Sequence, residues 1–270
     1  MKKLGFFFLL ILVILYCLGP YGWQLITSLK PEAQLTRLPP VLPETPTGVH
    51  YRSILREPLF WRVMGNSAGI ASLSTVFALL IGCLGAFGLA RFRVRYKALI
   101  LGFVLAATMF PPIATVSPLY ILVRALHLRD TWWALVITYT TFSLPLSLWV
   151  LTHFFQEVPE DIFLAAWVDG CTPFQIFHKI LVPLAAPGIF STAILVFLFS
   201  WNEFLYALTF TSTEASRTVP VAIALFPGIH EIPWGEIAAA SIVVTLPLVF
   251  FAFACQKRIV EGLTAGALKE

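Results

Sequence analysis

The sequence predicts an all-α protein that crosses a membrane several times and forms a single domain over residues 1–270. Three observations lead to this fold class. Hydrophobic residues make up 59% of the chain and charged residues only 12%, where a soluble domain has about 25% charged residues. The apolar residues are gathered into long runs, each near the roughly 20 residues that a helix needs to cross a bilayer. Charged residues fall almost entirely between these runs.

Six runs qualify as transmembrane helices. They contain no Lys, Arg or Asp, and Glu203 is their only acidic residue. The first run follows Lys2 and Lys3, as a signal peptide would, but it is longer than a signal core and has no small-x-small cleavage site, so we predict a retained helix. The predicted spans are residues 4–29, 63–90, 98–123, 131–156, 184–213 and 237–256.

A dense basic cluster predicts the orientation of the chain. Arg91, Arg93, Arg95 and Lys97 fill the short turn between the second and third spans, and such clusters resist translocation across the membrane. The turn is therefore expected on the cytoplasmic side. With six spans, both termini and residues 157–183 then also lie in the cytoplasm, as expected of a multi-pass protein of a bacterial cytoplasmic membrane.

Prolines mark the parts of the chain that are not simple helical rods. They interrupt the third span at Pro111, Pro112 and Pro118, and broken backbone at membrane depth requires protein or a water-filled cavity around it. Kinks around a pathway and plain helix packing both explain them. The loop over residues 30–62 is also rich in proline, and its extended chain is interpreted either as a linker or as a surface for an external partner.

Residues 164–183 form a semi-polar island that reads LAAWVDGCTPFQIFHKILVP, within the predicted cytoplasmic segment 157–183 between two apolar runs. Small residues Ala165 and Ala166 allow close approach, and Gly170 permits a turn that a side chain would block. Phe174 and Phe177 stand at helical spacing as apolar anchors. This pattern favours an element that fits into a groove on another protein. The alternative is an ordinary loop with an amphipathic helix.

One polar cluster, Trp201-Asn202-Glu203, lies within a span. A carboxylate inside a membrane helix is costly and faces the bundle interior or a water-filled cavity. The cluster is therefore a candidate substrate pathway, in which the aromatic ring stacks on a sugar and the polar groups bind hydroxyls. The alternative is a structural hydrogen bond to a neighbouring helix or a position near the outer interface.

No enzyme chemistry is visible in the sequence. The chain has no phosphate-binding G-x-x-x-x-G-K-[ST] loop, no H-E-x-x-H and no G-x-S-x-G motif. Its histidines are scattered, so no metal site is expected. A net charge of +4 gives no sign of nucleic-acid binding. The four cysteines, expected as free thiols, are Cys17, Cys83, Cys171 and Cys255.

The island resembles the cytoplasmic loop of the permease subunits of ATP-binding-cassette importers, whose pattern is E-A-A, three residues, G, nine residues, I-x-L-P. Leu164 and Val182 replace the usual glutamate and leucine. Residues 109–151, 196–208 and 256–269 also resemble the carbohydrate-uptake branch of this family, which includes maltose and trehalose importers. The resemblance implies that the ATPase-coupling residues are Leu164, Ala165, Ala166, Asp169, Gly170, Thr172, Phe174, Phe177, Ile180 and Pro183.

The resemblance also implies the partners of the chain. They are a homologous second permease subunit, two ATPase subunits, an extracytoplasmic sugar-binding protein and the lipid bilayer. This chain is expected to bind no cofactor, since ATP and Mg²⁺ belong to the ATPase subunits, and to move a di- or oligosaccharide by alternating access. A permease for another solute such as glycerol-3-phosphate is the main alternative, although the spans contain no Arg or Lys to pair with a phosphate. An ion-coupled secondary transporter is a further alternative.

Overall fold

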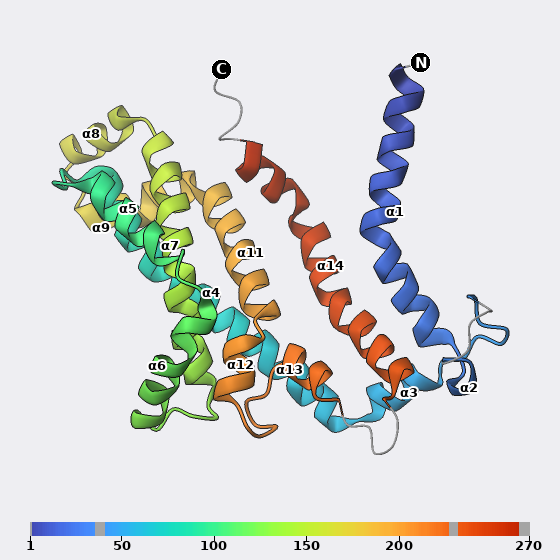
Figure 1. The fold of residues 1–270 in the computed structure, drawn as a ribbon. Coiled ribbons are helices and arrows are strands. Elements are labelled where there is room, and N and C mark those ends of the chain that lie inside the picture. Colours follow the sequence, from blue (N-terminus) through green and yellow to red (C-terminus); the bar gives the residue numbers. More distant parts are fainter. Residues whose placement is uncertain (1, 36–40, 227–231, 265–270) are drawn as a thin grey trace.

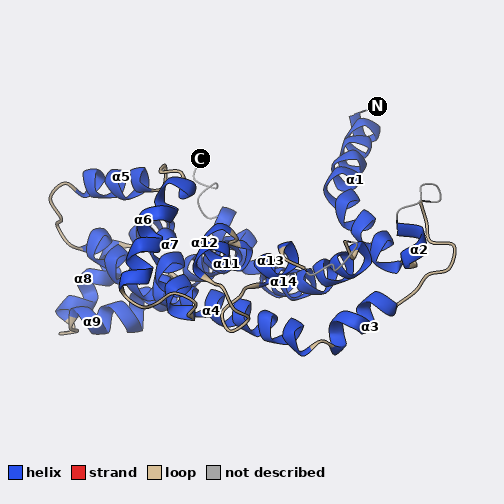
Figure 2. Cartoon of the chain, turned by 60° about the horizontal axis from the view of Figure 1, so that its bottom comes forward, coloured by secondary structure: helices blue, strands red, loops and turns tan. Residues whose placement is uncertain are grey.

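The computed structural model describes residues 2–35, 41–226 and 232–264, and this part of the chain contains helices, turns and loops but no strand (Figures 1 and 2). The all-α prediction is therefore confirmed for the described residues. The elements are α1 (Lys2–Leu29), α2 (Glu32–Leu35), α3 (Val49–Arg56), α4 (Pro58–Arg91), α5 (Lys97–Ala107), α6 (Pro112–Ala125), α7 (Trp132–Glu157), α8 (Glu160–Val168), α9 (Pro173–Ile176), a π-helical turn η1 (Phe177–Leu181), α10 (Val182–Leu184), α11 (Ala186–Asn202), α12 (Leu205–Phe210), α13 (Val219–Ala224) and α14 (Trp234–Thr264).

Four of the described helices are long and apolar enough to cross a membrane on their own: α1, α4, α7 and α14. Two further pairs are bent. Helices α5 and α6 meet at 88°, and residues Pro173–Leu184 meet α11 at 78°. Counting each bent pair as one span gives six. Residues 98–123, predicted as a single span, are thus divided between α5 and α6. The second bend falls at Ala185, at the start of the predicted span 184–213, and that span is divided further along, between α11 and α12.

The division of residues 98–123 has a chemical cause. Pro111 and Pro112 stand at the start of α6, where proline is tolerated, but neither residue donates the N–H that a continuous helix requires. The second division falls at Glu203, which is extended between α11 and α12. The prolines of the third span therefore act as a break in the helix.

The core forms where α4, α7 and α11 approach closely through small residues. A Cβ atom on Gly188 of α11 would lie 2.3 Å from the ring of Phe154 on α7, and one on Gly82 of α4 would lie 3.0 Å from Ser147 Cβ on α7. Small residues at such crossings let membrane helices pack backbone to backbone. Tyr139, which is fully buried, anchors the largest apolar cluster of this core.

The molecule has two distinct ends (Figure 1). Helices α8 and α9, the beginning of α1 and the C-terminal end of α14 lie at one end, and α2, α3, α6, α12 and α13 lie at the other. Residues 5–25 of α1 are exposed and almost entirely apolar. A helix of this kind is suited to lipid or to another membrane protein.

Several predicted features fall outside the described residues. Residues 36–40 of the proline-rich loop, residues 265–269 of the C-terminal resemblance and the side chain of Cys255 belong to this group. The other three cysteines are free thiols.

Candidate functional site

A single arginine holds the start of residues 157–183, hereafter the coupling segment. Arg91 is the last residue of α4, and its Nη2 donates hydrogen bonds to the carbonyl oxygens of Phe155 and Val158 at 2.5 and 2.6 Å. These carbonyls belong to the end of α7, where the helix leaves acceptors unsatisfied. The Arg91 guanidinium also lies 5.6 Å from the ring centroid of Phe163 on α8. One side chain thus joins α4, α7 and α8.

Gly170 ends α8 in the way that its sequence position suggests. Its φ is 78°, its N–H bonds the carbonyl of Trp167, and the N–H of Cys171 bonds the carbonyl of Ala166, both at 3.0 Å. This pair of hydrogen bonds around a glycine in the left-handed backbone conformation is a Schellman motif. A Cβ atom on Gly170 would meet nothing within 4 Å in this chain, so the glycine is required by its backbone conformation rather than by crowding within the subunit.

The next helix begins with a complete capping box. Thr172 Oγ1 accepts a hydrogen bond from the backbone N–H of Gln175 at 3.3 Å, and Gln175 Oε1 accepts one from the N–H of Thr172 at 2.8 Å. Such reciprocal bonds satisfy two of the free donors at a helix start. The turn from α8 to α9 is therefore held by local bonds at both sides of Gly170.

The two phenylalanines that the sequence suggested as anchors have different surroundings. Phe177 packs inward, with its ring centroid 5.3 Å from that of Phe87 and 6.5 Å from that of Phe155. Phe174 is 66% exposed. Phe177 therefore attaches the coupling segment to α4 and α7, and Phe174 is available to a partner.

The coupling segment exposes several large apolar side chains. Val168 is 88% exposed, which is more than any other large apolar residue in the described part of the chain. Ala166 is buried, while Ala165, Asp169, Thr172 and Pro183 are exposed and Ile180 is half-buried. The large exposed apolar residues of the segment are Ile162, Leu164, Trp167, Val168 and Phe174. Charged residues of the segment, among them Glu160, Asp161 and Lys179, are exposed as well. Exposed large apolar side chains gathered on one short segment are typical of a site of protein interaction.

The three residues of the candidate pathway are placed differently from one another. Trp201 is buried and stacks on Phe197 with ring centroids 5.7 Å apart. The side chain of Asn202 is exposed and donates to the carbonyl of Leu198 at 2.8 Å. Glu203 is half-buried at the break between α11 and α12. The three residues are consecutive in the sequence, but in the structure they differ in burial and in the groups that they contact.

The carboxylate of Glu203 is used within the chain. Its Oε1 accepts from the backbone N–H of Tyr206 at 3.0 Å, and its Oε2 accepts from the N–H of Ala207 at 3.1 Å and from the hydroxyl of Tyr139 at 2.8 Å. The hydroxyl of Tyr206 in turn lies 2.7 Å from Thr115 Oγ1 on α6. This geometry provides the structural hydrogen bond that was the alternative interpretation, and it links both broken spans. The pathway role of Glu203 stays a prediction.

At the other end of the molecule, Asp130 forms a clamp that no sequence motif indicated. It lies between α6 and α7 with φ 61°. Its carboxylate accepts hydrogen bonds from the backbone N–H of Ser212, from both the N–H and the hydroxyl of Thr213, and from the hydroxyl of Ser216. Desolvation opposes ionisation of Asp130, but these hydrogen bonds outweigh it and hold the pKa of the carboxyl well below its usual range.

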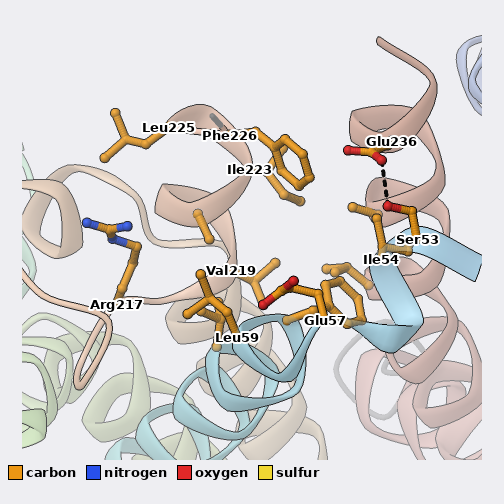
Figure 3. Close-up of a pocket in the computed structure, with 15 residues that line it drawn as sticks. Ser53, Ile54, Glu57, Leu59, Arg217, Val219, Ile223, Leu225, Phe226 and Glu236 are labelled. Atoms are coloured by element: carbon orange, nitrogen blue, oxygen red, sulfur yellow. Dashed lines mark hydrogen bonds between the residues drawn. The ribbon is translucent and has the colours of Figure 1, made fainter. Parts of the chain in front are cut away.

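A cavity of about 400 Å³ lies between α3, α4, α13 and α14 (Figure 3). Its walls are largely apolar, and the charged side chains of Glu57, Glu236 and Arg217 also line it. Ser53 Oγ donates a hydrogen bond of 2.6 Å to Glu236. The described residues contain no group of side chains suited to hold a metal ion.

Comparison with known proteins gives concordant results. The family described as "Binding-protein-dependent transport system inner membrane component" matches residues 74–264. The trehalose transport system permease protein SugB of Mycobacterium tuberculosis is 46% identical over 260 residues, which cover 96% of this chain and 94% of that protein. The trehalose/maltose transport system permease protein MalG of Thermococcus litoralis is 42% identical over 262 residues, with the same two coverages.

A solved structure has the same fold. The crystal structure of a bacterial ABC transporter involved in the import of the acidic polysaccharide alginate superimposes with a TM-score of 0.81 and 20% identity, covering 95% of this chain and 96% of that one. The sequence shows Arg91 only as one charge of a basic cluster, and no sequence pattern marks Asp130. Only the folded chain brings their hydrogen-bond partners near, because those partners lie more than sixty residues away.

Proposed function

The chain belongs to the family of inner membrane components of binding-protein-dependent transport systems, and from this premise we propose that it is the permease subunit of an ATP-driven importer of a di- or oligosaccharide, with trehalose or maltose as the first candidates. The names of two relatives that share more than 40% of their residues with it support this substrate class. The absence of Arg and Lys from the middle of the spans favours a neutral sugar over a phosphate ester such as glycerol-3-phosphate.

The observation that carries the mechanism is the exposed apolar surface of the coupling segment. Leu164, Val168 and Phe174 are each more than half exposed. The segment sits in a cleft on an ATPase subunit, and the partner covers these side chains. ATP and Mg²⁺ bind to the ATPase subunits and not to this chain.

Arg91 and Phe177 explain how movement of the coupling segment reaches the membrane. Both connect the segment to α4 and α7 through contacts that do not depend on a partner. When the ATPases close, the segment carries the ends of these helices with it, and the cavity between the permeases opens outward. A ligand can shift such an equilibrium only through different contacts in the two states, and the exposed segment provides such contacts.

The remaining partners follow from the same premise. A homologous permease subunit completes the pathway, and an extracytoplasmic binding protein delivers the sugar. The coupling segment and both termini lie in the cytoplasm, in keeping with the basic turn at residues 91–97. Asn202 is retained as a substrate contact because its side chain is exposed at the end of α11.

Uptake by the reconstituted complex tests this proposal. Proteoliposomes that contain this chain, its partner permease and the ATPases are supplied with the binding protein and with labelled trehalose, maltose or glycerol-3-phosphate. We expect sugar uptake that requires Mg²⁺ and ATP on the side of the membrane where the ATPase subunits lie. This uptake is expected to continue when a protonophore is added. Uptake that an ion gradient drives without ATP would contradict the proposal, and transport of glycerol-3-phosphate alone would overturn the substrate class.

A further inference from the structure

The turn between α4 and α5 is an exposed basic surface that the proposed transport cycle does not use. The side chains of Arg93 and Arg95 are exposed, and that of Lys97 is half-buried. In the described part of the chain none of the three forms an ion pair. Three clustered cations with no acidic partner among the described residues indicate an anionic ligand outside the subunit.

The turn has a defined shape. Phe92 packs against Phe87 with ring centroids 5.4 Å apart, the N–H of Val94 bonds the carbonyl of Phe92 at 2.9 Å, and Tyr96 has φ 63°. The guanidinium of Arg95 lies 5.2 Å from the ring centroid of Tyr96. The cations are thus presented from a folded turn. Aromatic side chains next to them, with Tyr96 65% exposed, are typical of the headgroup level of a membrane.

The helix that follows the turn provides the second, independent observation. α5 has no buried residue, and Leu99 and Phe103 are 71% and 77% exposed. Figure 2 shows α5 at the periphery of the bundle. No side chain caps its start and its first turn contains no acidic residue, so the free N–H groups add positive potential beside the cations. The cationic side chains of the turn and the exposed apolar side chains of α5 match a lipid that has an anionic headgroup and acyl chains.

We propose that the turn over residues 92–97, together with the exposed side of α5, binds an anionic phospholipid of the surrounding bilayer. Arg93, Arg95 and Lys97 contact the phosphate, and Leu99 and Phe103 contact the acyl chains. Arg91 is not part of this site, because its guanidinium binds the end of α7. A basic cluster that only set the orientation of the chain during insertion would have no preference among lipids in the folded protein.

Native mass spectrometry of the full-length chain in detergent tests the site. Phosphatidylglycerol and phosphatidylcholine with identical acyl chains are titrated separately, and bound lipid is counted. We expect wild type to retain phosphatidylglycerol in preference to phosphatidylcholine. The triple variant Arg93→Gln, Arg95→Gln, Lys97→Gln is expected to bind phosphatidylglycerol at least about tenfold more weakly, because each cation at an anionic membrane surface contributes several-fold. Inorganic phosphate at equal concentration is expected not to displace the lipid.

A matched variant removes the same number of charges from the other end of the molecule. Arg52→Gln, Arg56→Gln, Arg62→Gln replaces three exposed arginines and is expected to leave phosphatidylglycerol binding unchanged. Equal loss in both triple variants, or equal binding of the two lipids by wild type, would overturn the proposal. Displacement of the lipid by inorganic phosphate would also overturn the proposal, because the turn would then be a site for a free anion and not for a lipid.

A charge-preserving variant covers the case in which the triple variant fails to fold. Arg93→Lys, Arg95→Lys keeps the positive charge and is expected to keep the preference for phosphatidylglycerol within about twofold. Helix content measured by circular dichroism identifies folded samples. Loss of the lipid preference in this folded variant would contradict a site based on charge.

Discussion

The coupling segment and the Asp130 clamp, at opposite ends of the molecule, differ in what they leave exposed. The turn in the middle of the coupling segment is held by local hydrogen bonds, as in the capping box between Thr172 and Gln175, and several large apolar side chains of the segment are exposed. At Asp130, donors from residues 82 to 86 positions away converge on one carboxylate. The clamp is complete within this chain, and the coupling segment has an exposed apolar surface that we propose a partner ATPase covers.

Substitutions at the two ends of the molecule are therefore expected to have different effects. Substitutions in the coupling segment should alter the behaviour of the assembled complex more than the stability of the subunit. Substitutions at the Asp130 clamp should alter the stability of the subunit first, because its bonds already have their partners.

The largest expected effect is at Gly170. Gly170→Trp places a β-carbon on a backbone with φ 78°, which costs about 1–2 kcal/mol, and puts a large ring on the surface that meets the ATPase. We expect ATPase binding and sugar uptake to fall to background. Gly170→Asn is the control, since asparagine tolerates the left-handed conformation, and it is expected to bind the ATPase. If Gly170→Trp bound the ATPase and supported uptake at wild-type levels, the coupling segment would not be the element that docks on the ATPase.

Arg91 comes next, because it joins the coupling segment to two membrane helices. Arg91→Gln removes two charge-assisted hydrogen bonds from the end of α7. We expect uptake to fall about tenfold while the ATPase still binds, and the subunit to lose about 2 kcal/mol of unfolding free energy. Uptake and ATP hydrolysis are measured in the same proteoliposomes. A variant that transports at the wild-type rate would show that these bonds do not transmit movement.

Glu203 lies between the two ends and distinguishes a structural role from a pathway role. Glu203→Ala leaves the buried hydroxyl of Tyr139 without its acceptor and uncaps α12, so we expect a loss of about 2–3 kcal/mol in unfolding free energy. Asn202→Ala, whose side chain is exposed, is expected to leave the melting temperature unchanged. If Glu203→Ala lowered uptake with no change in melting temperature, the carboxylate would belong to the pathway.

The smallest expected effect is at Asp130 and depends on pH. The folded pKa of Asp130 is lowered, so its ionised form stabilises the fold above the ordinary aspartate pKa of about 4. That contribution is lost as pH falls toward the lowered folded pKa. Asp130→Asn is expected to cost about 1 kcal/mol at neutral pH. The difference in melting temperature from wild type is expected to shrink below about pH 4, and a difference independent of pH would contradict this assignment.

Fold class, the apolar segments and the coupling segment were accessible from sequence because each depends on local pattern. Span composition, the prolines at positions 111 and 112 and the spacing around Gly170 are all readable in one dimension. The long-range contacts were not. Arg91 looked like one basic residue among four, and only the folded chain brings it to the carbonyls of residues 155 and 158. The sequence marks Glu203 because a carboxylate inside a membrane helix is costly. Its hydrogen-bond partners, however, depend on a helix break that composition does not locate.

The central claim is that a partner ATPase covers the exposed apolar surface of the coupling segment. Its most direct test is thiol labelling of Val168→Cys, at the most exposed large apolar position of the described chain, with the four native cysteines replaced by serine. Val41→Cys, which is exposed before α3, is the control. We expect the ATPase subunits to protect position 168 from the reagent and to leave position 41 unchanged. Equal labelling of position 168 with and without the ATPases would contradict the account.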